Sequence, residues 1–283
     1  MLTKDLIKEK LVDLEKEYVG FMMKHFAGWE LWAKASQRMA DGEQVKEEEI
    51  PEGFVLEFKL IRAVLEMEAT GKFDWNNPLL RELFEQLAQS TFYKLWGEII
   101  TKISLRLADL ARVKTLVEVG AGRGNLTGIM LQQIAENNMP VKLIVTDASP
   151  VVLENMGKLK DRYPQVNLEI LLWDIKDAPP KELLEKVQPP CLSYERASIM
   201  YINIPSIENI TRISDIVVFG DMFNYTGTLY AYDEISKRIG AQPLFYSDIK
   251  PLLETCLTDH FMFDLRAQEE LNFPNTTMLI GWK

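Results

Sequence analysis

Apolar residues recur with a helical period through about the first 112 residues, and no strand-like alternation interrupts them. At the start of the chain, apolar residues fall every three or four positions with charged residues between them: Leu2, Leu6, Ile7, Leu11 and Leu14. The same criterion predicts further helices over about 18–39, 55–69, 79–89 and 91–111. We therefore expect an all-α amino-terminal domain over residues 1–112, which could serve as a lid, a substrate domain or a dimerisation domain.

After residue 113 the pattern changes to short apolar runs that alternate with helical segments, which is typical of a parallel sheet with helices on its faces. The runs predict strands at 115–119, 141–147, 166–174, 191–196 and 216–221. Two closing strands, 260–265 and 276–282, are expected to form a hairpin around residues 272–275. The predicted fold class is α/β: a Rossmann-like, mostly parallel seven-stranded sheet with an antiparallel carboxyl-terminal hairpin, in residues 113–283.

The composition of the chain disfavours several classes of binding partner. The net charge is −10, which argues against a protein whose main partner is a nucleic-acid backbone. The chain has two cysteines without a C-x-x-C pair and two histidines far apart, so neither a disulfide scaffold nor a metal site is predicted. No apolar run reaches membrane-spanning length, and the charged amino terminus is unlike a signal peptide. We expect a cytoplasmic protein without a membrane partner. The sequence leaves open whether the protein forms a homo-oligomer.

Glycines at alternate positions directly follow the first predicted strand. Glu118 is followed by Gly120, Gly122 and Gly124, and an amphipathic helix comes next. Glycine allows positive φ and close approach of a ligand to the backbone, and the helix start offers unpaired N–H groups. The spacing is not the G-x-G-x-x-G of dinucleotide-binding folds, and the lysine of a P-loop is missing.

The string E-x-G-x-G-x-G resembles the first motif of class I S-adenosylmethionine (SAM)-dependent methyltransferases, and the resemblance covers about the last 170 residues. It implies SAM as the cofactor. The turn made by Gly120, Ala121, Gly122 and Gly124 would wrap the methionine part, and Glu118 would order the loop and the cofactor's amino end. The terminal hairpin is similar to the antiparallel last strand of that family's sheet, which Rossmann dehydrogenases lack.

Two acids end the next strands, where ligands of open α/β sheets bind. Asp147 can accept both hydroxyls of a ribose. An acid at this position does the same in dinucleotide enzymes, so Asp147 alone does not identify the cofactor. The alternative is that Asp147 caps the following helix. The resemblance assigns Asp147 to the SAM ribose, with Ala148 lining the adenine pocket. It assigns Asp174 and Ile175 to the adenine, whereas the alternative for Asp174 is a strand-end acid in solvent.

The fourth predicted strand carries the candidates for catalysis, Glu195 and Tyr194. In the family, this position faces the methionine end of SAM and the methyl acceptor. The tetrapeptide that amino-methylating enzymes use here is absent, which disfavours a nucleobase amine as acceptor. Glu195 could bind the cofactor, could act as a general base if burial raises its pKa, or could pair with Arg196 as part of the structure.

Aromatic residues in two segments are candidates for substrate binding. Phe223, Tyr225 and Tyr230 lie where the family often carries substrate-binding insertions, and Tyr93 and Trp96 lie on the helix before the glycine turn. Tyrosines could hold a substrate or flank a sulfonium cation. The alternative is that these rings pack the helical domain onto the sheet.

The predicted function is SAM-dependent methyl transfer to a small-molecule acceptor, through an oxygen, nitrogen or carbon nucleophile. One alternative is a non-catalytic SAM-binding or protein-interaction module on the same fold. The second is a nicotinamide-dependent oxidoreductase, against which the glycine spacing and the terminal hairpin both argue. A nucleic-acid methyltransferase is disfavoured by charge and by the missing amine motif.

Overall fold

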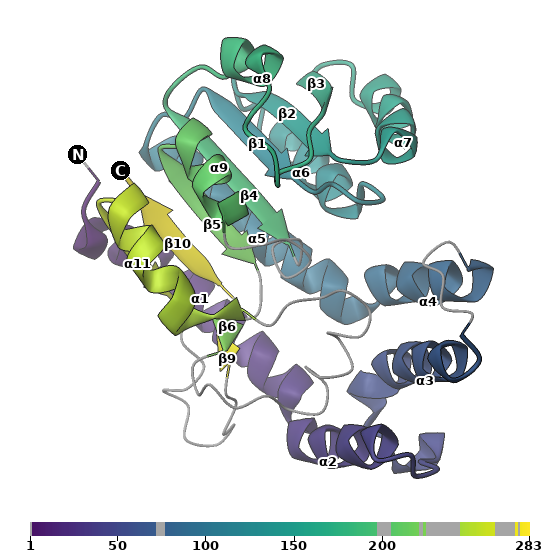
Figure 1. The fold of residues 1–283 in the computed structure, drawn as a ribbon. Coiled ribbons are helices and arrows are strands. Elements are labelled where there is room, and N and C mark those ends of the chain that lie inside the picture. The colour runs from purple at the N-terminus through teal and green to yellow at the C-terminus, as the bar shows by residue number, and fades with distance from the viewer. Residues whose placement is uncertain are drawn as a thin grey trace.

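The computed structural model describes residues 2–71, 77–196, 205–220, 223–224, 244–263, 275–276 and 278–283. Helices cover both faces of a seven-stranded sheet, and a further stack of helices lies at one end (Figure 1). The amino-terminal helices are α1 (Lys4–Phe26), α2 (Trp29–Ala40), η1 (Glu47–Glu49), η2 (Glu52–Phe54), α3 (Val55–Ala69), α4 (Pro78–Gln89) and α5 (Thr91–Leu110). The later helices are α6 (Asn125–Glu136), α7 (Pro150–Arg162), α8 (Lys181–Lys186), α9 (Pro205–Ile213) and α11 (Tyr246–Cys256).

The sheet has the order β3-β2-β1-β4-β5-β10-β8. Its strands are β1 (Thr115–Val119), β2 (Lys142–Asp147), β3 (Asn167–Leu172), β4 (Cys191–Arg196), β5 (Ile216–Gly220), β8 (Asp259–Met262) and β10 (Leu279–Trp282). The pairs from β3 to β5 are parallel, whereas β10 runs antiparallel to both β5 and β8. The predicted mostly parallel sheet with antiparallel strands near the carboxyl end is confirmed.

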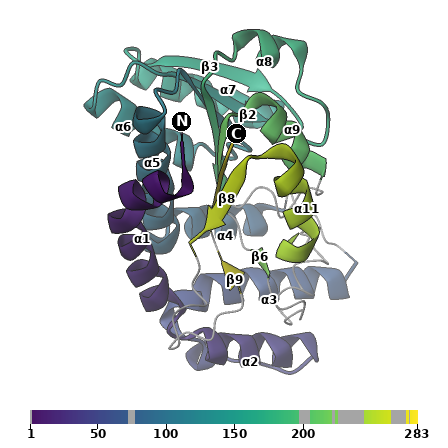
Figure 2. The same ribbon diagram turned by 90° about the vertical axis from the view of Figure 1, so that its left-hand side faces the viewer.

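The two faces of the sheet are buried by different helices. Leu116, Leu192 and Val218 pack with residues of α1, α5 and α6, whereas Val117 and Val217 pack with α9 and α11. Figure 2 shows α1, α5 and α6 on one side of the sheet and α9 and α11 on the other. Successive residues of one strand thus face opposite layers, which explains why the strands read as continuous apolar runs.

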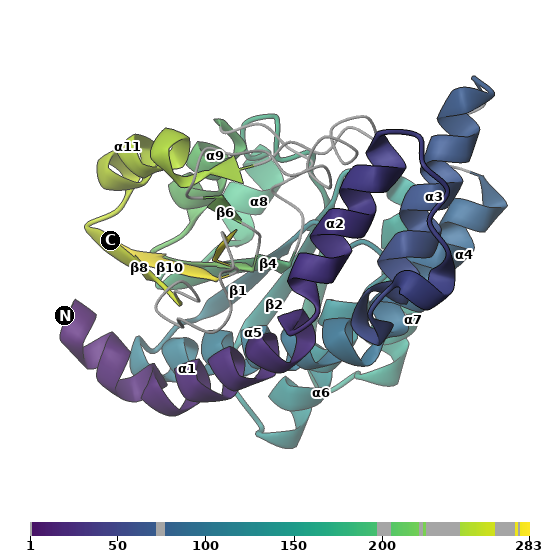
Figure 3. The same ribbon diagram turned by 90° about the horizontal axis from the view of Figure 1, so that it is seen from below.

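The helices α2, α3 and α4 are stacked beyond the carboxyl ends of the parallel strands, and Figure 3 gives the same stack viewed from below. Between α3 and α4 lies a separate apolar cluster that includes Leu60, Val64, Leu80 and Leu83. This stack therefore stands over the edge of the sheet at which α/β proteins bind their ligands.

The amino-terminal helices differ from the prediction at one boundary. The sequence predicts a break between residues 14 and 18, but α1 continues to Phe26 and the break falls at Ala27 and Gly28. A Cβ at Gly28 would come within 2.5 Å of the Pro51 Cβ, so the chain turns where Pro51 packs against it. This contact is between residues distant in sequence, and local periodicity does not reveal it.

A small second sheet was not predicted. It pairs β6 (Phe223–Asn224) with β7 (Leu244–Phe245) and with β9 (Asn275–Thr276). Most of the predicted turn at 272–275 lies outside the described residues, and its Asn275 begins β9. Strands of two residues are too short to produce a periodic signal. Within the part of the chain that the structure describes, no helix is both long and apolar enough to cross a membrane.

Candidate functional site

Glu118 is a buried acid beneath the glycine turn, with 1% of its surface exposed. Parallel pairing of β1 and β4 sets it beside Tyr194, whose hydroxyl donates a 3.0 Å hydrogen bond to Glu118 Oε2. Burial raises the pKa of Glu118 to about 7, and the Thr127 and Tyr194 hydroxyls oppose this rise. A cationic group placed beside this carboxyl would lower its pKa and draw it into the ionised form.

The three glycines of the turn all have positive φ: +67° at Gly120, +53° at Gly122 and +79° at Gly124. A Cβ at Gly122 would meet no atom within 4 Å, so this stretch of backbone is open to a ligand. A Cβ at Gly124 would overlap the end of the Met156 side chain at 2.4 Å. Gly122 therefore exposes the backbone, whereas Gly124 lets α6 and α7 pack closely.

Asp147, at the end of β2, holds the turn in place. Its Oδ2 accepts a 2.9 Å hydrogen bond from the Gly122 N–H, and its Oδ1 accepts one of 2.8 Å from the Ser149 N–H. Each carboxylate oxygen has a second lone pair, so these bonds leave acceptor capacity for a ligand hydroxyl. Asp147 therefore joins the glycine turn to Ser149, the residue before α7, and does not cap that helix, whereas its role toward a ribose stays a prediction.

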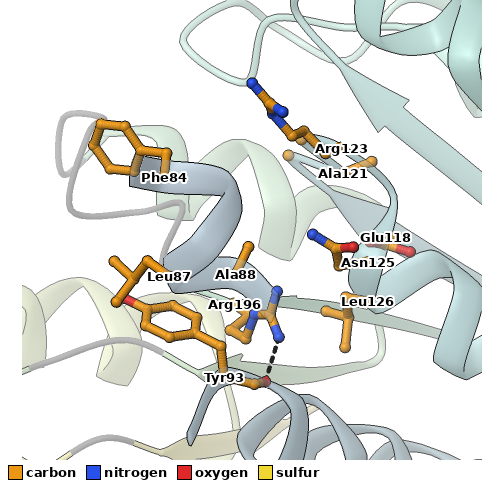
Figure 4. Close-up of a pocket in the computed structure, with 12 residues that line it drawn as sticks. Phe84, Leu87, Ala88, Tyr93, Glu118, Ala121, Arg123, Asn125, Leu126 and Arg196 are labelled. Carbon is orange, nitrogen blue, oxygen red and sulfur yellow. Dashed lines mark hydrogen bonds between the residues drawn. The ribbon is translucent and has the colours of Figure 1, made fainter. Parts of the chain in front are cut away.

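A cavity of about 250 Å³ lies between the glycine turn and the α4–α5 junction (Figure 4). It brings together five of the residues that the sequence singled out: Tyr93, Glu118, Gly120, Ala121 and Gly122. Its remaining walls come from α4, the start of α6 and the end of β4: Phe84, Leu87, Ala88, Arg123, Asn125, Leu126 and Arg196.

Helix α4 is fastened to the turn by two polar contacts near this cavity. Arg123 forms an ion pair with Glu85, and the Gln89 side-chain amide donates a 3.2 Å hydrogen bond to Asn125 Oδ1. Both contacts are exposed to solvent. The sequence did not predict these two contacts, because the partners lie more than 30 residues apart and none of the four residues belongs to a recognisable local motif.

Arg196 is the second residue that sequence reasoning missed. From the sequence it was predicted only as a partner of Glu195, but its side chain lines the cavity (Figure 4). Its Nη1 donates a 2.6 Å hydrogen bond to the Tyr93 backbone oxygen, and its guanidinium lies 5.4 Å from the Tyr93 ring centre. The sequence offered one sign of this role, because Arg196 is a cationic residue at the end of the fourth predicted strand, where ligands of α/β sheets bind.

The predicted adenine-binding residues lie at the ends of β2 and β3, outside the cavity walls. Ala148 and Asp174 are exposed, and Asp174 Oδ1 accepts a 3.0 Å hydrogen bond from the Lys176 N–H. Ile175 is buried in the apolar layer on the α9 side, where its backbone oxygen accepts a bond from Asn209. The structure therefore places an acid, but not the isoleucine side chain, on the open surface.

The candidates for catalysis and substrate binding are separated. Tyr194 and Glu195 are fully buried and do not line the cavity, although Tyr194 contacts Glu118. Trp96 is 1% exposed and packs against Phe92 and Tyr93, so it belongs to the core of this layer. The backbone of Phe223 forms part of β6, whereas Tyr225 and Tyr230 lie outside the described residues.

A second cavity, of about 550 Å³, lies among the end of α1, η2, the start of α3 and the α4–α5 junction. His25 stacks on Phe92 at 3.7 Å between ring centres, and burial lowers its pKa to about 4. Glu57 also lines this space, and burial raises its pKa to about 7. Leu87 contributes to the walls of both cavities, so the two spaces are neighbours.

No group of three or more His, Cys, Asp or Glu side chains in the described residues is arranged to hold a metal ion.

The strand order, the antiparallel β10 and the glycine turn after β1 together define the fold of class I SAM-dependent methyltransferases. Solved structures with this fold are similar along most of the chain. The citrinin polyketide synthase CMeT domain matches with a TM-score of 0.64 at 16% identity, over 81% of this chain and 65% of that one. The DszA carbon methyltransferase matches with a TM-score of 0.64 at 12% identity, over 81% and 66%.

A geranyl diphosphate methyltransferase in complex with SAM matches more distantly, with a TM-score of 0.50 at 13% identity, over 74% of this chain and 92% of that one. In sequence, the chain is 30% identical over 101 residues to the non-reducing polyketide synthase dpfgA of Gibberella zeae. That match covers 34% of this chain and 5% of the synthase. The chain also spans only about two thirds of the citrinin synthase domain and of the DszA methyltransferase structure. No family model matches.

Proposed function

We propose that this chain is a SAM-dependent methyltransferase acting on a small-molecule acceptor. One observation carries the proposal: a buried carboxyl, Glu118, lies beneath an open glycine turn in a cavity at the carboxyl end of β1. Ligands of open α/β sheets bind at this edge. Similarity to the class I methyltransferase fold supports SAM as the ligand of the glycine turn.

The residues present fit a cofactor with an amino-acid end and a nucleoside end. Glu118 Oε1 is buried and makes no hydrogen bond of good geometry with the described residues, which suits it to an ammonium group. The backbone around Gly122 is open. Asp147, tied to that backbone, would accept the ribose hydroxyls, and exposed Asp174 would face the adenine.

When bound, SAM supplies an electrophilic methyl carbon on a positively charged sulfur. The chain's own residues align the reactants and limit the access of water. Tyr194 fixes the orientation of Glu118, Asp147 fixes the turn, and α4 covers the cavity through Arg123 and Glu85. A general base is needed only if the acceptor must lose a proton, and Glu195 remains a proposal for that role.

For the acceptor, we propose an acidic carbon on a molecule with an apolar body. Similarity in fold to carbon methyltransferase domains supports the carbon nucleophile. The cavity of about 550 Å³ beside Leu87 supports the apolar body, since Phe21, Leu56 and Phe92 contribute to its walls. In this cavity, burial of His25 and Glu57 shifts their pKa values toward the uncharged forms near neutral pH, which suits an uncharged ligand.

The alternatives are disfavoured by specific features. An oxidoreductase would not need the antiparallel β10 or the G-x-G-x-G spacing, and similarity in fold points to methyltransferases. A non-catalytic module would bind SAM but leave every acceptor unmodified.

Calorimetric titration with SAM and S-adenosylhomocysteine tests the cofactor. We expect Glu118→Ala to weaken binding of both by at least about tenfold, because one charged hydrogen bond is worth about 1.5–3 kcal/mol. The control is Glu82→Ala, an exposed acid on α4 outside the cavity walls. Transfer of labelled methyl from SAM to a metabolite mixture then tests catalysis. SAM binding without any labelled product would favour the non-catalytic module, and NADH binding without SAM binding would favour the oxidoreductase.

A further inference from the structure

The cavity beneath the glycine turn has side chains of both charges on its walls. Glu118 is acidic and buried, whereas Arg196 and Arg123 are basic. Arg123 is exposed and forms an ion pair with Glu85. Arg196 is half-buried, and Glu118 is near enough to favour its charged form and raise its pKa, although burial has the larger and opposite effect. The cavity thus has a buried acid and a half-buried base on its walls.

The position of the Arg196 guanidinium is well defined. Arg196 is the last residue of β4, and its Nη1 donates a 2.6 Å hydrogen bond to the Tyr93 backbone oxygen. Ala88 of α4 and Leu126 of α6 line the same cavity, so the guanidinium lies at the meeting point of three elements.

Gly97 explains how the guanidinium fits against α5. A Cβ at this helical position would lie 2.8 Å from Arg196 Nη1. A glycine inside a helix is less favourable than alanine by about 1 kcal/mol. Gly97 therefore makes α5 less stable than an alanine at the same position would. The space that the glycine leaves is the space that Arg196 occupies.

We propose that Arg196 binds the carboxylate of the cofactor's amino-acid end while Glu118 binds its ammonium group. An α-amino acid is a zwitterion, and a guanidinium matches the geometry of a carboxylate with two parallel N–H donors. Arg196 would thereby determine specificity for an intact amino-acid end. This inference rests on the proposed function, because it assigns a further residue to the same site.

The test compares two ligands that share the adenosine and differ at the amino-acid end. S-adenosylhomocysteine carries the carboxylate and ammonium, whereas 5′-methylthioadenosine carries neither. In calorimetric titrations we expect Arg196→Gln to weaken S-adenosylhomocysteine binding by about tenfold or more, in line with the loss of a charged hydrogen bond. Affinity for 5′-methylthioadenosine should stay within about twofold of the wild-type value. Arg212→Gln, which changes an exposed side chain of α9 outside the cavity walls, is the control.

A second variant keeps the arginine and moves it. Gly97→Ala should displace the guanidinium and give the same selective loss of S-adenosylhomocysteine affinity, while the added alanine favours the helix. Equal losses for both ligands in Arg196→Gln would mean that Arg196 only supports the fold, and unchanged affinity for S-adenosylhomocysteine would also overturn the proposal. If the wild-type chain binds neither ligand, the proposed function itself fails, which is a different outcome.

Discussion

The Tyr194 hydroxyl donates a 3.0 Å hydrogen bond to Oε2 of Glu118, and both side chains are almost fully buried. Burial also raises the pKa of Tyr194 well above its ordinary value, so the phenol keeps its proton and remains a donor at any physiological pH. The acid at the base of the glycine turn is therefore held by a partner on the neighbouring strand. If Glu118 binds the cofactor as we propose, Tyr194 would act on that site through Glu118, as a positioning residue.

Removing this partner should change the pH dependence of binding. In Tyr194→Phe, Glu118 loses a bond that lowers its pKa, so its ionised form develops at a higher pH. We expect the pH midpoint of S-adenosylhomocysteine affinity to move upward by about 1, equivalent to roughly 1.4 kcal/mol. Calorimetric titrations between pH 6 and 9 measure this midpoint. A uniform loss of affinity at every pH would show that Tyr194 does not act through the ionisation of Glu118.

The raised pKa of Glu118 predicts a pH-dependent cost to stability. Between pH 4.5 and about 7, folded Glu118 keeps a proton that the unfolded chain releases, so its contribution lowers the free energy of unfolding as pH rises. Glu118→Gln removes this contribution. The difference in stability between variant and wild type should therefore move in the variant's favour from pH 5 to pH 8, by at most about 3 kcal/mol.

Urea titrations at the two pH values measure that difference. His25, whose pKa is lowered, has the opposite dependence, and Glu57 has the same one, but both contribute equally to the two proteins. The comparison therefore isolates Glu118. A difference that stays constant with pH would contradict the assignment of a raised pKa.

Two glycines four residues apart should respond to alanine in opposite ways. Gly124 has φ +79°, and an added Cβ would lie 2.4 Å from the Met156 side chain, so Gly124→Ala should destabilise the fold by about 1–3 kcal/mol. Gly128 is inside α6, and a Cβ there would meet nothing within 4 Å. Gly128→Ala should stabilise it by up to about 1 kcal/mol. Thermal unfolding monitored by circular dichroism compares the pair, and destabilisation of similar size in both would refute this account.

The contact between Arg123 and Glu85 should govern how often α4 lifts from the turn. An exposed ion pair is worth about 0–1 kcal/mol, so Glu85→Gln should leave global stability nearly unchanged. Local opening of α4 should become up to about fivefold more frequent, because 1 kcal/mol corresponds to that factor. Hydrogen exchange over residues 78–89 measures it, with Glu82→Gln as the control. High salt should reproduce the effect in the wild type, and equal exchange in both variants would argue against this role.

Elements with a strong local signal were predicted from the sequence. The helix over 55–69 and the strands 115–119 and 191–196 have the predicted bounds, because apolar periodicity and turn residues define both ends. The break in the first helical segment was misplaced. Its position depends on Pro51 packing against Gly28, which no local pattern encodes.

In the site, too, features with a local sequence signal were predicted and features set by distant contacts were not. Glycines and acids at strand ends are visible in the sequence, and the structure gathers Glu118, Gly120, Ala121 and Gly122 around one cavity. Arg196 and Arg123 could not be assigned, because their roles depend on where α4 and α5 cross the turn. Those crossings are set by burial of apolar faces distributed over many residues, so a motif search has nothing to match.

The position of β10 between β5 and β8 has a consequence for folding. The segment from β1 to β4, which includes the glycine turn, lies within residues 115–196, whereas β5 obtains its second neighbour only from Leu279–Trp282. Until that segment docks, β5 has an unpaired edge of apolar residues, the kind of edge that templates association between chains. Burial of Ile216, Val218 and Phe219 thus depends on a segment more than 50 residues away. A chain that ends before Leu279 should form the glycine turn and still aggregate through β5.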